Sequence, residues 1–175
     1  MVPSILHVPS NVHLMDSTPI SKFLETTYPD PPVLFRSQLG NEVEFQARKF
    51  IGPIHRRSVV SREINILSPR SGEYFRRRAK EGLGHPLKQL LDMDKEKQPW
   101  RGRDQRIRAV EALMQTHQEE GPFIMGARSS YTDFFVVESL QSARVVDEGV
   151  FQRYVAYSGF GDVYEACLPN MKTRD

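Results

Sequence analysis

The sequence has little cysteine and no long hydrophobic run. Cys167 is the single cysteine among 175 residues, which excludes an internal disulfide and a multi-cysteine zinc site. No apolar run approaches the roughly 20 residues that cross a bilayer, and the first residues lack the basic-then-apolar order of a signal peptide. These absences predict a protein of a reducing compartment, the cytoplasm, without a membrane partner.

Metal-ligand spacing is also missing, since the five histidines are scattered along the chain. We therefore predict no metal cofactor. Hydrophobic residues make up 39% of the chain and charged residues 26%, which is the composition of a soluble globular protein. The length is enough for one ordinary domain, or a small piece plus a domain, with a real core.

Positive charge is unevenly placed, although the net charge is only +2. Residues 54–80 contain seven arginines and one lysine against two glutamates. Such a segment either meets phosphates or forms the solvated face of a helix. We favour the second interpretation, with Arg76 to Arg78 outside and Tyr74 and Phe75 inside, because aromatics interleaved for base stacking are absent. A nucleic-acid partner is not predicted.

The first 32 residues have a pattern of their own. Apolar positions in 2–8 and 12–14 read as two strands joined by a turn at 9–11. Residues 20–28 then place apolar side chains at helical spacing, and the proline-rich segment 29–32 ends the pattern. The order is strand, turn, strand, helix. A lone two-stranded hairpin is marginal in water, so these strands need further strands to pair with.

The remainder of the chain is predicted to be helical, because strand-like alternation does not return. The predicted helices cover 38–60 with a kink at Gly52-Pro53, 71–80, 86–93, 103–118, 130–146, 149–157 and 162–168. The fold class is therefore mainly α, with a β-hairpin and helix followed by an all-α bundle. The boundaries predicted for these two parts are 1–32 and 38–175.

A capping box precedes the most apolar of these helices. Ser130 is placed to accept a hydrogen bond from the backbone N–H three residues later, and Asp133 is placed to accept one from the backbone N–H of Ser130. A capping box alone is common and structural. Because the following residues are apolar, we expect Asp133 to be largely buried, which makes its hydrogen bonds obligatory.

Asp16 and Ser17 lie where the second strand passes into the first helix. A serine hydroxyl and free backbone N–H groups at a helix start can bind a carboxylate, and a neighbouring aspartate can hold an ammonium group. Together they could grip both charged groups of an α-amino acid. Taken alone, the pair is better explained as a helix cap and a charge that complements the helix dipole.

Two other reactive side chains carry less information. Cys167 has no basic neighbour that would lower its pKa, which favours an idle or structural thiol. His55 lies beside Arg56 and Arg57, and the sequence leaves open whether it lines a substrate cleft or is solvated.

In combination these segments resemble the cytosolic glutathione transferase superfamily. The resemblance rests on Val2-Pro3-Ser4-Ile5, Met15-Asp16-Ser17, Ile20-Ser21-Lys22-Phe23-Leu24, Tyr28-Pro29, Gly121-Pro122-Phe123-Ile124-Met125-Gly126 and Ser130-Tyr131-Thr132-Asp133-Phe134. Segments 71–77 and 144–148 are similar to the fungal β-etherase-like group of that superfamily. The hairpin and first helix then resemble the second half of a thioredoxin-like domain, and the rest resembles the family's helical C-terminal domain.

The resemblance implies a site and a ligand. In the family, the Val-Pro pair carries a cis-proline whose neighbouring backbone binds the cysteinyl residue of glutathione, and the acidic-Ser pair binds its γ-glutamyl end. Carried over, glutathione-binding residues are Val2, Pro3, Asp16 and Ser17. Glutathione would be the co-substrate, a hydrophobic electrophile the second substrate, and a homodimer the assembly.

The resemblance also leaves one part of the family unmatched. A complete thioredoxin-like half begins with a βαβ unit that carries the catalytic Ser, Cys or Tyr, and we expect this chain to be N-terminally truncated relative to it. We therefore assign no catalytic residue. Two functions stay open: an enzyme that conjugates glutathione or cleaves an aryl ether, plausible in fungal secondary-metabolite synthesis, and a non-catalytic binding or interaction protein.

Overall fold

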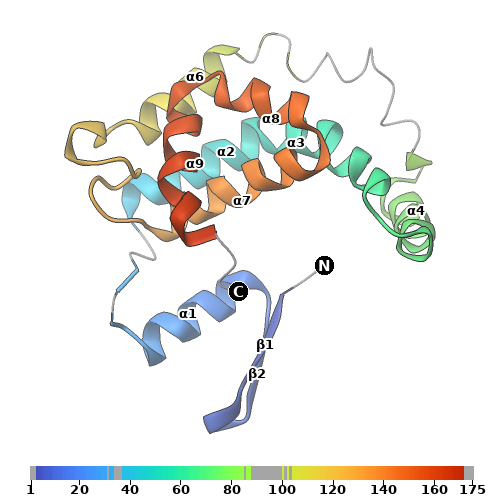
Figure 1. Ribbon diagram of the computed structural model, residues 1–175, viewed down its shortest axis with the longest axis horizontal. Coiled ribbons are helices and arrows are strands. Elements are labelled where there is room, and N and C mark those ends of the chain that lie inside the picture. Colours follow the sequence, from blue (N-terminus) through green and yellow to red (C-terminus); the bar gives the residue numbers. More distant parts are fainter. Residues whose placement is uncertain are drawn as a thin grey trace.

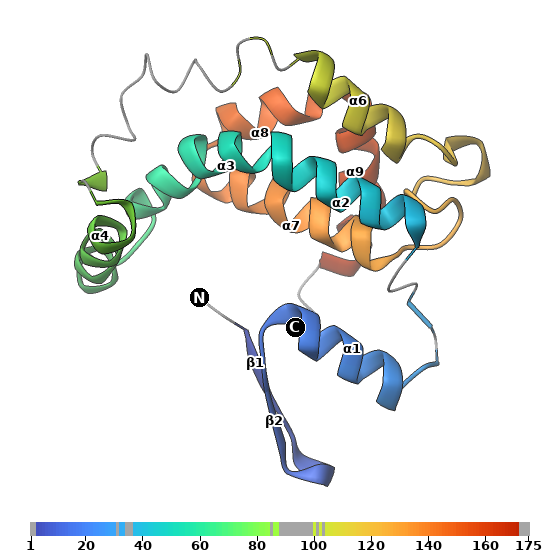
Figure 2. The same ribbon diagram turned by 180° about the vertical axis from the view of Figure 1, so that it is seen from behind.

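The computed structural model describes residues 3–30, 32–33, 37–84, 86–87, 100, 102 and 104–171. It contains a two-stranded antiparallel hairpin and one helix, followed by a bundle of helices (Figures 1 and 2). The mainly helical fold class predicted from the sequence is confirmed. Among the described helices, none combines the length and the apolar character needed to cross a bilayer.

The bundle surrounds one central helix. Its helices are α2 (Gln38–Phe50), α3 (Gly52–Ser58), α6 (Asp104–Met114), α7 (Tyr131–Val146), α8 (Glu148–Val155) and α9 (Ser158–Met171). Helix α7 packs against α2, α8 and α9, while α6 packs against α2 and α9. The buried core spans residues from Val43 to Cys167 and draws on all six helices.

The predicted kink at Gly52-Pro53 lies between α2 and α3. Helix α2 begins at a cap in which Ser37 Oγ accepts a hydrogen bond from the Gly40 N–H at 2.8 Å. Pro53 has no N–H to continue the helical pattern and so falls in the first turn of α3. A 3₁₀ segment, η2 (Val60–Asn65), follows α3, where the sequence predicted the end of a single long helix.

Two close contacts join helices that are distant in sequence. A Cβ at Gly40 of α2 would lie 2.5 Å from Thr132 Oγ1 of α7, so glycine permits this approach. Between α6 and α9, Glu111 is only 8% exposed. Its Oε1 accepts hydrogen bonds from the Gly159 N–H at 3.1 Å and the Ser158 hydroxyl at 3.2 Å, which caps α9. The first contact therefore holds α2 against α7, and the second holds α9 against α6.

Helix α4 (Pro69–Leu83) lies apart from the bundle, at its edge (Figure 1). It begins at Ser68, whose Oγ accepts from the Ser71 N–H at 3.3 Å, and it ends at Gly84 in the left-handed conformation. Arg76 to Arg78 are exposed as predicted. The prediction that Tyr74 points inward is wrong, since it is 57% exposed. The reason is that α4 packs against η2 and does not cross the core.

Other predicted helix positions differ in extent. Helix α9 begins at Ser158, four residues before the predicted start, and continues to Met171. The helix predicted over 86–93 falls mostly outside the described residues. Helix α6 buries Ile107, Val110 and Met114.

The N-terminal part has no buried residue between 3 and 30. Strands β1 (Ser4–His7) and β2 (Val12–Met15) pair with Ile5 opposite Leu14. The following helix, α1 (Ser17–Thr27), is tied to the hairpin by a 2.8 Å hydrogen bond between His7 Nε2 and the Tyr28 hydroxyl. The core therefore lies wholly in the helical bundle. The division at 1–32 and 38–175 stays a prediction.

Candidate functional site

The junction between β2 and α1 brings Pro3, Asp16 and Ser17 together. Asp16 is the N-cap of α1, with a left-handed φ of 79°. Its N–H donates to the Pro3 carbonyl at 2.9 Å, which ties the start of β1 to the start of the helix. With a ψ of 141°, Asp16 lies outside the left-handed helical region in which most non-glycine residues of positive φ are found, so this backbone conformation is uncommon for aspartate. Val2, the remaining residue predicted to bind glutathione, lies outside the described residues.

The start of α1 is open to an anion. The Ser17 and Thr18 N–H groups have no intrahelical acceptor, and Asp16 forms no side-chain cap hydrogen bond with them. Pro19 has no N–H, and the Ile20 N–H donates to the Asp16 carbonyl at 3.2 Å. The Ser17 hydroxyl donates instead to Asp16 Oδ1 at 3.4 Å. Both side chains are exposed. The site thus offers N–H groups and a hydroxyl for a carboxylate, beside a carboxylate for an ammonium.

The start of α7 is buried, and its polar groups stabilise the helix and do not face solvent. Asp133 has no exposed surface and belongs to a capping box with Ser130. Asp133 Oδ2 accepts from the Ser130 N–H at 2.7 Å and from the Ser130 hydroxyl at 2.6 Å. Its Oδ1 accepts from the Ile124 N–H at 2.8 Å. The third bond joins α7 to the preceding loop, a contact that the sequence did not indicate.

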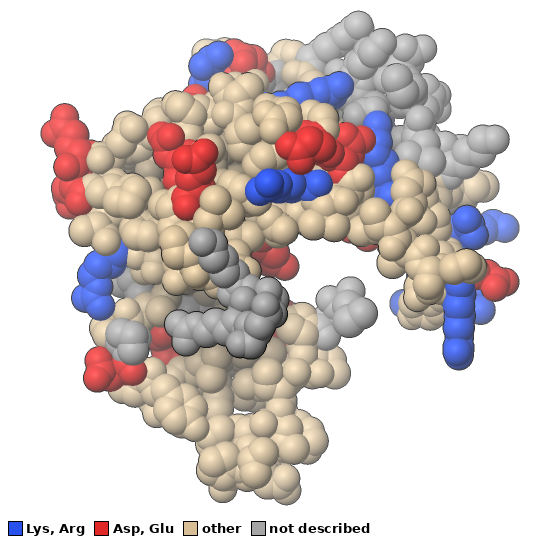
Figure 3. Space-filling view, viewed as in Figure 1, with Lys and Arg blue, Asp and Glu red and all other residues tan. Residues whose placement is uncertain are grey.

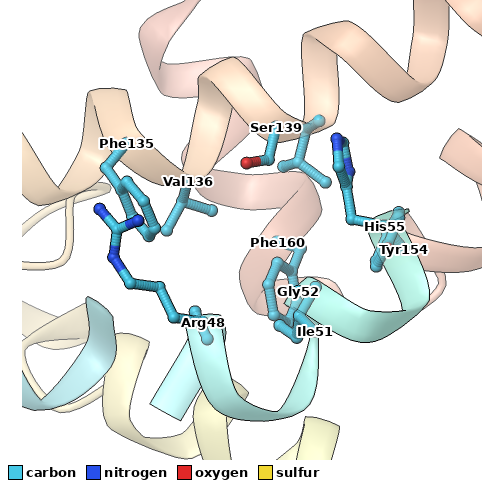
Figure 4. A pocket seen from close by; sticks show the side chains of 11 residues that line it. Arg48, Ile51, Gly52, His55, Phe135, Val136, Ser139, Tyr154 and Phe160 are labelled. Carbon is cyan, nitrogen blue, oxygen red and sulfur yellow. The ribbon is translucent and has the colours of Figure 1, made fainter. Parts of the chain in front are cut away.

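A pocket of about 170 Å³ opens between α2, α3 and α7. Its wall is largely apolar, and Arg48, His55, Ser139 and Tyr154 add polar groups (Figure 4). The Arg48 guanidinium lies 4.4 Å from the centre of the Phe135 ring. Because the Arg48 side chain is 65% exposed, this pair marks the solvent side. His55 thus lines a pocket, and that this pocket is a substrate cleft stays a prediction.

Two buried polar atoms at this pocket have no hydrogen-bond partner among the described residues. They are His55 Nδ1 and the Tyr154 hydroxyl. Burial lowers the pKa of His55 and raises the pKa of Tyr154. Sequence reasoning missed Tyr154, since an apolar helical pattern does not reveal whether a tyrosine hydroxyl is paired.

The burial of His55 predicts a pH dependence of stability. As the pH falls from about 7 to about 5.5, the unfolded chain protonates this imidazole before the folded chain does, because the folded pKa is lowered. The unfolded state then binds more protons, so the free energy of unfolding should fall. Replacing the imidazole by His55→Leu should make this fall smaller.

Urea denaturation at a series of pH values tests this expectation. Wild type and His55→Leu are compared by the slope of the free energy of unfolding against pH, because the substitution also changes the absolute free energy at every pH. His13→Gln, which removes an exposed histidine, is the control. Equal slopes in wild type and His55→Leu would contradict the burial of a neutral His55.

Within the part of the chain that the structure describes, the remaining charged and nucleophilic groups do not form a reactive cluster with these sites. Cys167 is fully buried, and burial raises the pKa of its thiol to about 12, as expected for an idle thiol. The arginines of α4 lie at the edge of the molecule, with those visible in Figure 3 well apart from the hairpin. The hydroxyl of Tyr157 donates to Asp104 on α6 at 2.8 Å and serves packing.

The helical bundle and its capped central helix define a glutathione transferase C-terminal domain. The family model described as "Glutathione S-transferase, C-terminal domain" matches residues 43–156. The chain therefore belongs to the glutathione S-transferase family, and the superfamily predicted from the sequence is confirmed. Membership of the β-etherase-like group stays a prediction.

Relatives of known sequence or structure agree with this assignment. The chain is 28% identical over 162 residues to a glutathione S-transferase-like protein, ustS, of Aspergillus flavus, an alignment that covers 79% of this chain and 55% of the relative. The chain thus spans about half the length of that curated relative.

Two solved fungal glutathione transferases share the fold. GSTFuA2 of Phanerochaete chrysosporium superposes with a TM-score of 0.77 at 20% identity, covering 100% of this chain and 72% of that one. CsGST63524 of Ceriporiopsis subvermispora, solved in complex with glutathione, gives 0.67 at 22% identity, covering 91% and 71%.

Proposed function

We propose that this glutathione S-transferase-like chain binds glutathione at the start of α1. The observation that carries the proposal is the pair of Asp16 and Ser17 beside unpaired backbone N–H groups. The γ-glutamyl end of glutathione has one ammonium and one carboxylate on the same carbon, which is the charge pattern that this junction can meet. Pro3 and Val2 would bind the cysteinyl backbone, as the family resemblance implies.

The reaction we propose is transfer of the glutathionyl group to a carbon atom of a hydrophobic electrophile or of an aryl ether. The thiol gives up its proton, and the thiolate forms a C–S bond. In a substitution the bond from that carbon to the leaving group breaks and the leaving group departs with its electron pair, whereas in an addition the carbanion that forms takes up a proton from water. A role in fungal secondary metabolism is part of the proposal. A homodimer and a cytoplasmic location are proposals on the same footing.

A second function, binding without catalysis, has its own support. Three of the described thiol and phenol groups have a clearly shifted pKa, and in all three the pKa is raised. They are Cys167, Tyr154 and Tyr157. An upward shift disfavours the thiolate or phenolate form, so none of these three groups is a ready nucleophile. We therefore keep a non-catalytic binding or interaction protein as the alternative, with no catalytic residue assigned.

Calorimetric titration of the chain with glutathione tests the site. Asp16→Asn and Ser17→Ala should each weaken the binding of glutathione. For Asp16→Asn the dissociation constant should rise roughly ten- to a hundredfold, which corresponds to the loss of a hydrogen bond to a charged group. Asparagine is chosen because it keeps the size and shape of the aspartate side chain and removes its charge. Cysteinylglycine, which lacks the γ-glutamyl residue, should bind wild type no better than it binds Asp16→Asn.

Thr26→Ala is the matched control, at the other end of the same helix, where Thr26 Oγ1 donates to the Lys22 carbonyl at 2.8 Å. It should bind glutathione like wild type. Unchanged affinity in both Asp16→Asn and Ser17→Ala would place glutathione elsewhere. If wild type conjugates glutathione to an activated aryl halide and Asp16→Asn does not, the result favours an enzyme. If wild type binds glutathione without turnover, the result favours a non-catalytic binding protein.

A further inference from the structure

The outer edge of β1 carries backbone groups without partners. In an antiparallel pair of strands, opposite residues alternate between those that exchange backbone hydrogen bonds and those that do not. The Asp16 N–H donates to the Pro3 carbonyl, so the alternation begins with a bonded pair. It leaves the N–H and C=O groups of Ser4 and Leu6 pointing away from β2. Neither residue has another backbone hydrogen bond among the described residues, so this edge can accept one more strand.

Charged side chains that would repel another strand are absent from the hairpin. Natural proteins protect an exposed edge with such side chains, lysine above all. Residues 3–15 contain no Asp, Glu, Lys or Arg. Helix α1 covers one face of the hairpin, where the centres of the His7 and Phe23 rings are 4.9 Å apart. The other face exposes 48% of Leu6 and 66% of Met15. A neutral edge beside an apolar face favours pairing with an equally neutral strand.

The edge of β1 is complementary to itself. When two copies of β1 lie antiparallel with Ile5 of one copy opposite Ile5 of the other, Ser4 of each copy lies opposite Leu6 of the second copy. Both residues point their N–H and C=O groups outward, so each such pair exchanges two hydrogen bonds. Pro3 and Pro9 have no N–H and limit the pairing to the residues between them. A two-fold axis at Ile5 therefore satisfies all the outer backbone groups of Ser4 and Leu6.

The hairpin is also accessible to a second copy. It extends away from the helical bundle in both views (Figures 1 and 2), and none of the described residues from 3 to 30 is buried. A two-stranded hairpin is marginal in water, whereas a sheet of more strands that packs against helices is stable.

We propose that two copies of this chain pair along β1 and form a four-stranded sheet in the order β2, β1, β1, β2. Both α1 helices then lie on one face of this sheet, and both Leu6 side chains lie on the other. The proposal rests on the homodimer proposed above, for which it names the surface. It does not depend on glutathione binding, so Asp16→Asn should remain a dimer.

Analytical ultracentrifugation of the full chain over a range of concentrations tests the contact. The chain has a mass of 20.2 kDa, and wild type should sediment with twice that mass. Leu6→Pro removes an N–H that points away from β2 and places a ring in the contact, so it should sediment as a monomer. His13→Pro is the matched control. His13 lies opposite Leu6, and its N–H points to the far edge of β2, so this variant should remain a dimer.

A disulfide on the two-fold axis tests the register. Opposite residues that do not exchange hydrogen bonds have Cα atoms roughly 4.5 Å apart, which a disulfide can span. Ile5→Cys should therefore give a covalent dimer on non-reducing gels after oxidation with diamide. Leu14→Cys is the matched control, because Leu14 lies opposite Ile5 and is also half-buried, but would lie roughly 14 Å from its counterpart. Cys167 is fully buried and should not cross-link.

The outcomes separate this contact from other assemblies. Leu6→Pro should keep the helical circular dichroism of wild type, since the hairpin contributes nothing to the buried core, so its monomeric state would report on the contact and not on misfolding. A monomeric wild type would overturn both the contact and the homodimer. A dimer that survives Leu6→Pro and is not cross-linked by Ile5→Cys would overturn the contact alone. Cross-linking of Leu14→Cys in place of Ile5→Cys would also overturn it, since the copies would then pair along β2.

Discussion

Replacing Asp133 with alanine should lower the free energy of unfolding by about 3 kcal/mol or more. The carboxylate is fully buried and accepts three hydrogen bonds, from the Ser130 N–H, the Ser130 hydroxyl and the Ile124 N–H. Alanine leaves two buried backbone N–H groups without an acceptor, and each such group costs about 1–3 kcal/mol. Because small domains are stable by only about 5–15 kcal/mol, the variant should approach unfolding.

Urea denaturation monitored by circular dichroism measures this loss. Asp133→Asn is the graded control, because its single carbonyl oxygen can still accept from part of the set. It should fall between wild type and Asp133→Ala. A midpoint for Asp133→Ala equal to that of wild type would mean that the start of α7 does not depend on this carboxylate, contrary to the observed geometry.

The start of α7 was predictable because its chemistry is local. Ser130 and Asp133 are three residues apart, and the apolar residues after them imply burial. The same locality explains the kink at Gly52-Pro53, which depends on one missing N–H. The hairpin and α1 were likewise predicted from turn residues and the spacing of apolar residues.

What the sequence could not provide depends on contacts between distant segments. The bond from Ile124 to Asp133 needs the loop to return to α7, and the capping of α9 by Glu111 joins residues 48 positions apart. The inward orientation predicted for Tyr74 was wrong because helical spacing shows which residues share a face of a helix but not whether another element packs against that face. The unpaired hydroxyl of Tyr154 is a property of packing that no pattern of residue types encodes.

The candidate glutathione site lies on the part of the chain with no buried residue. Residues 3–30 contribute nothing to the buried core, whereas the pocket and the start of α7 lie within the bundle. Local stability follows buried contacts, so the β1, β2 and α1 segment should open more readily than the bundle. Substitutions in the bundle and at Asp16 should accordingly act independently of each other.

Gly121→Ala should lower the free energy of unfolding by about 1–3 kcal/mol, through the loop that holds Ile124 against Asp133. A Cβ at position 121 would lie 2.6 Å from the Gly126 carbonyl oxygen and 2.6 Å from Ala127 Cα, so backbone atoms must move apart. The loop is closed by two hydrogen bonds between Phe123 and Gly126, at 3.0 and 2.9 Å. Opening it shifts the Ile124 N–H away from Asp133.

A double-mutant cycle of Gly121→Ala and Asp133→Ala, measured by urea denaturation, tests whether this loop and the start of α7 act as one unit. The combined loss should be smaller than the sum of the single losses, because each substitution weakens the same contact between Ile124 and Asp133. Gly82→Ala is the matched control, since a Cβ there meets nothing within 4 Å on α4. Alanine favours helix over glycine, so this control should be neutral or stabilising by up to about 1 kcal/mol. Strictly additive losses would show that the loop is held in place by contacts other than the one to Asp133.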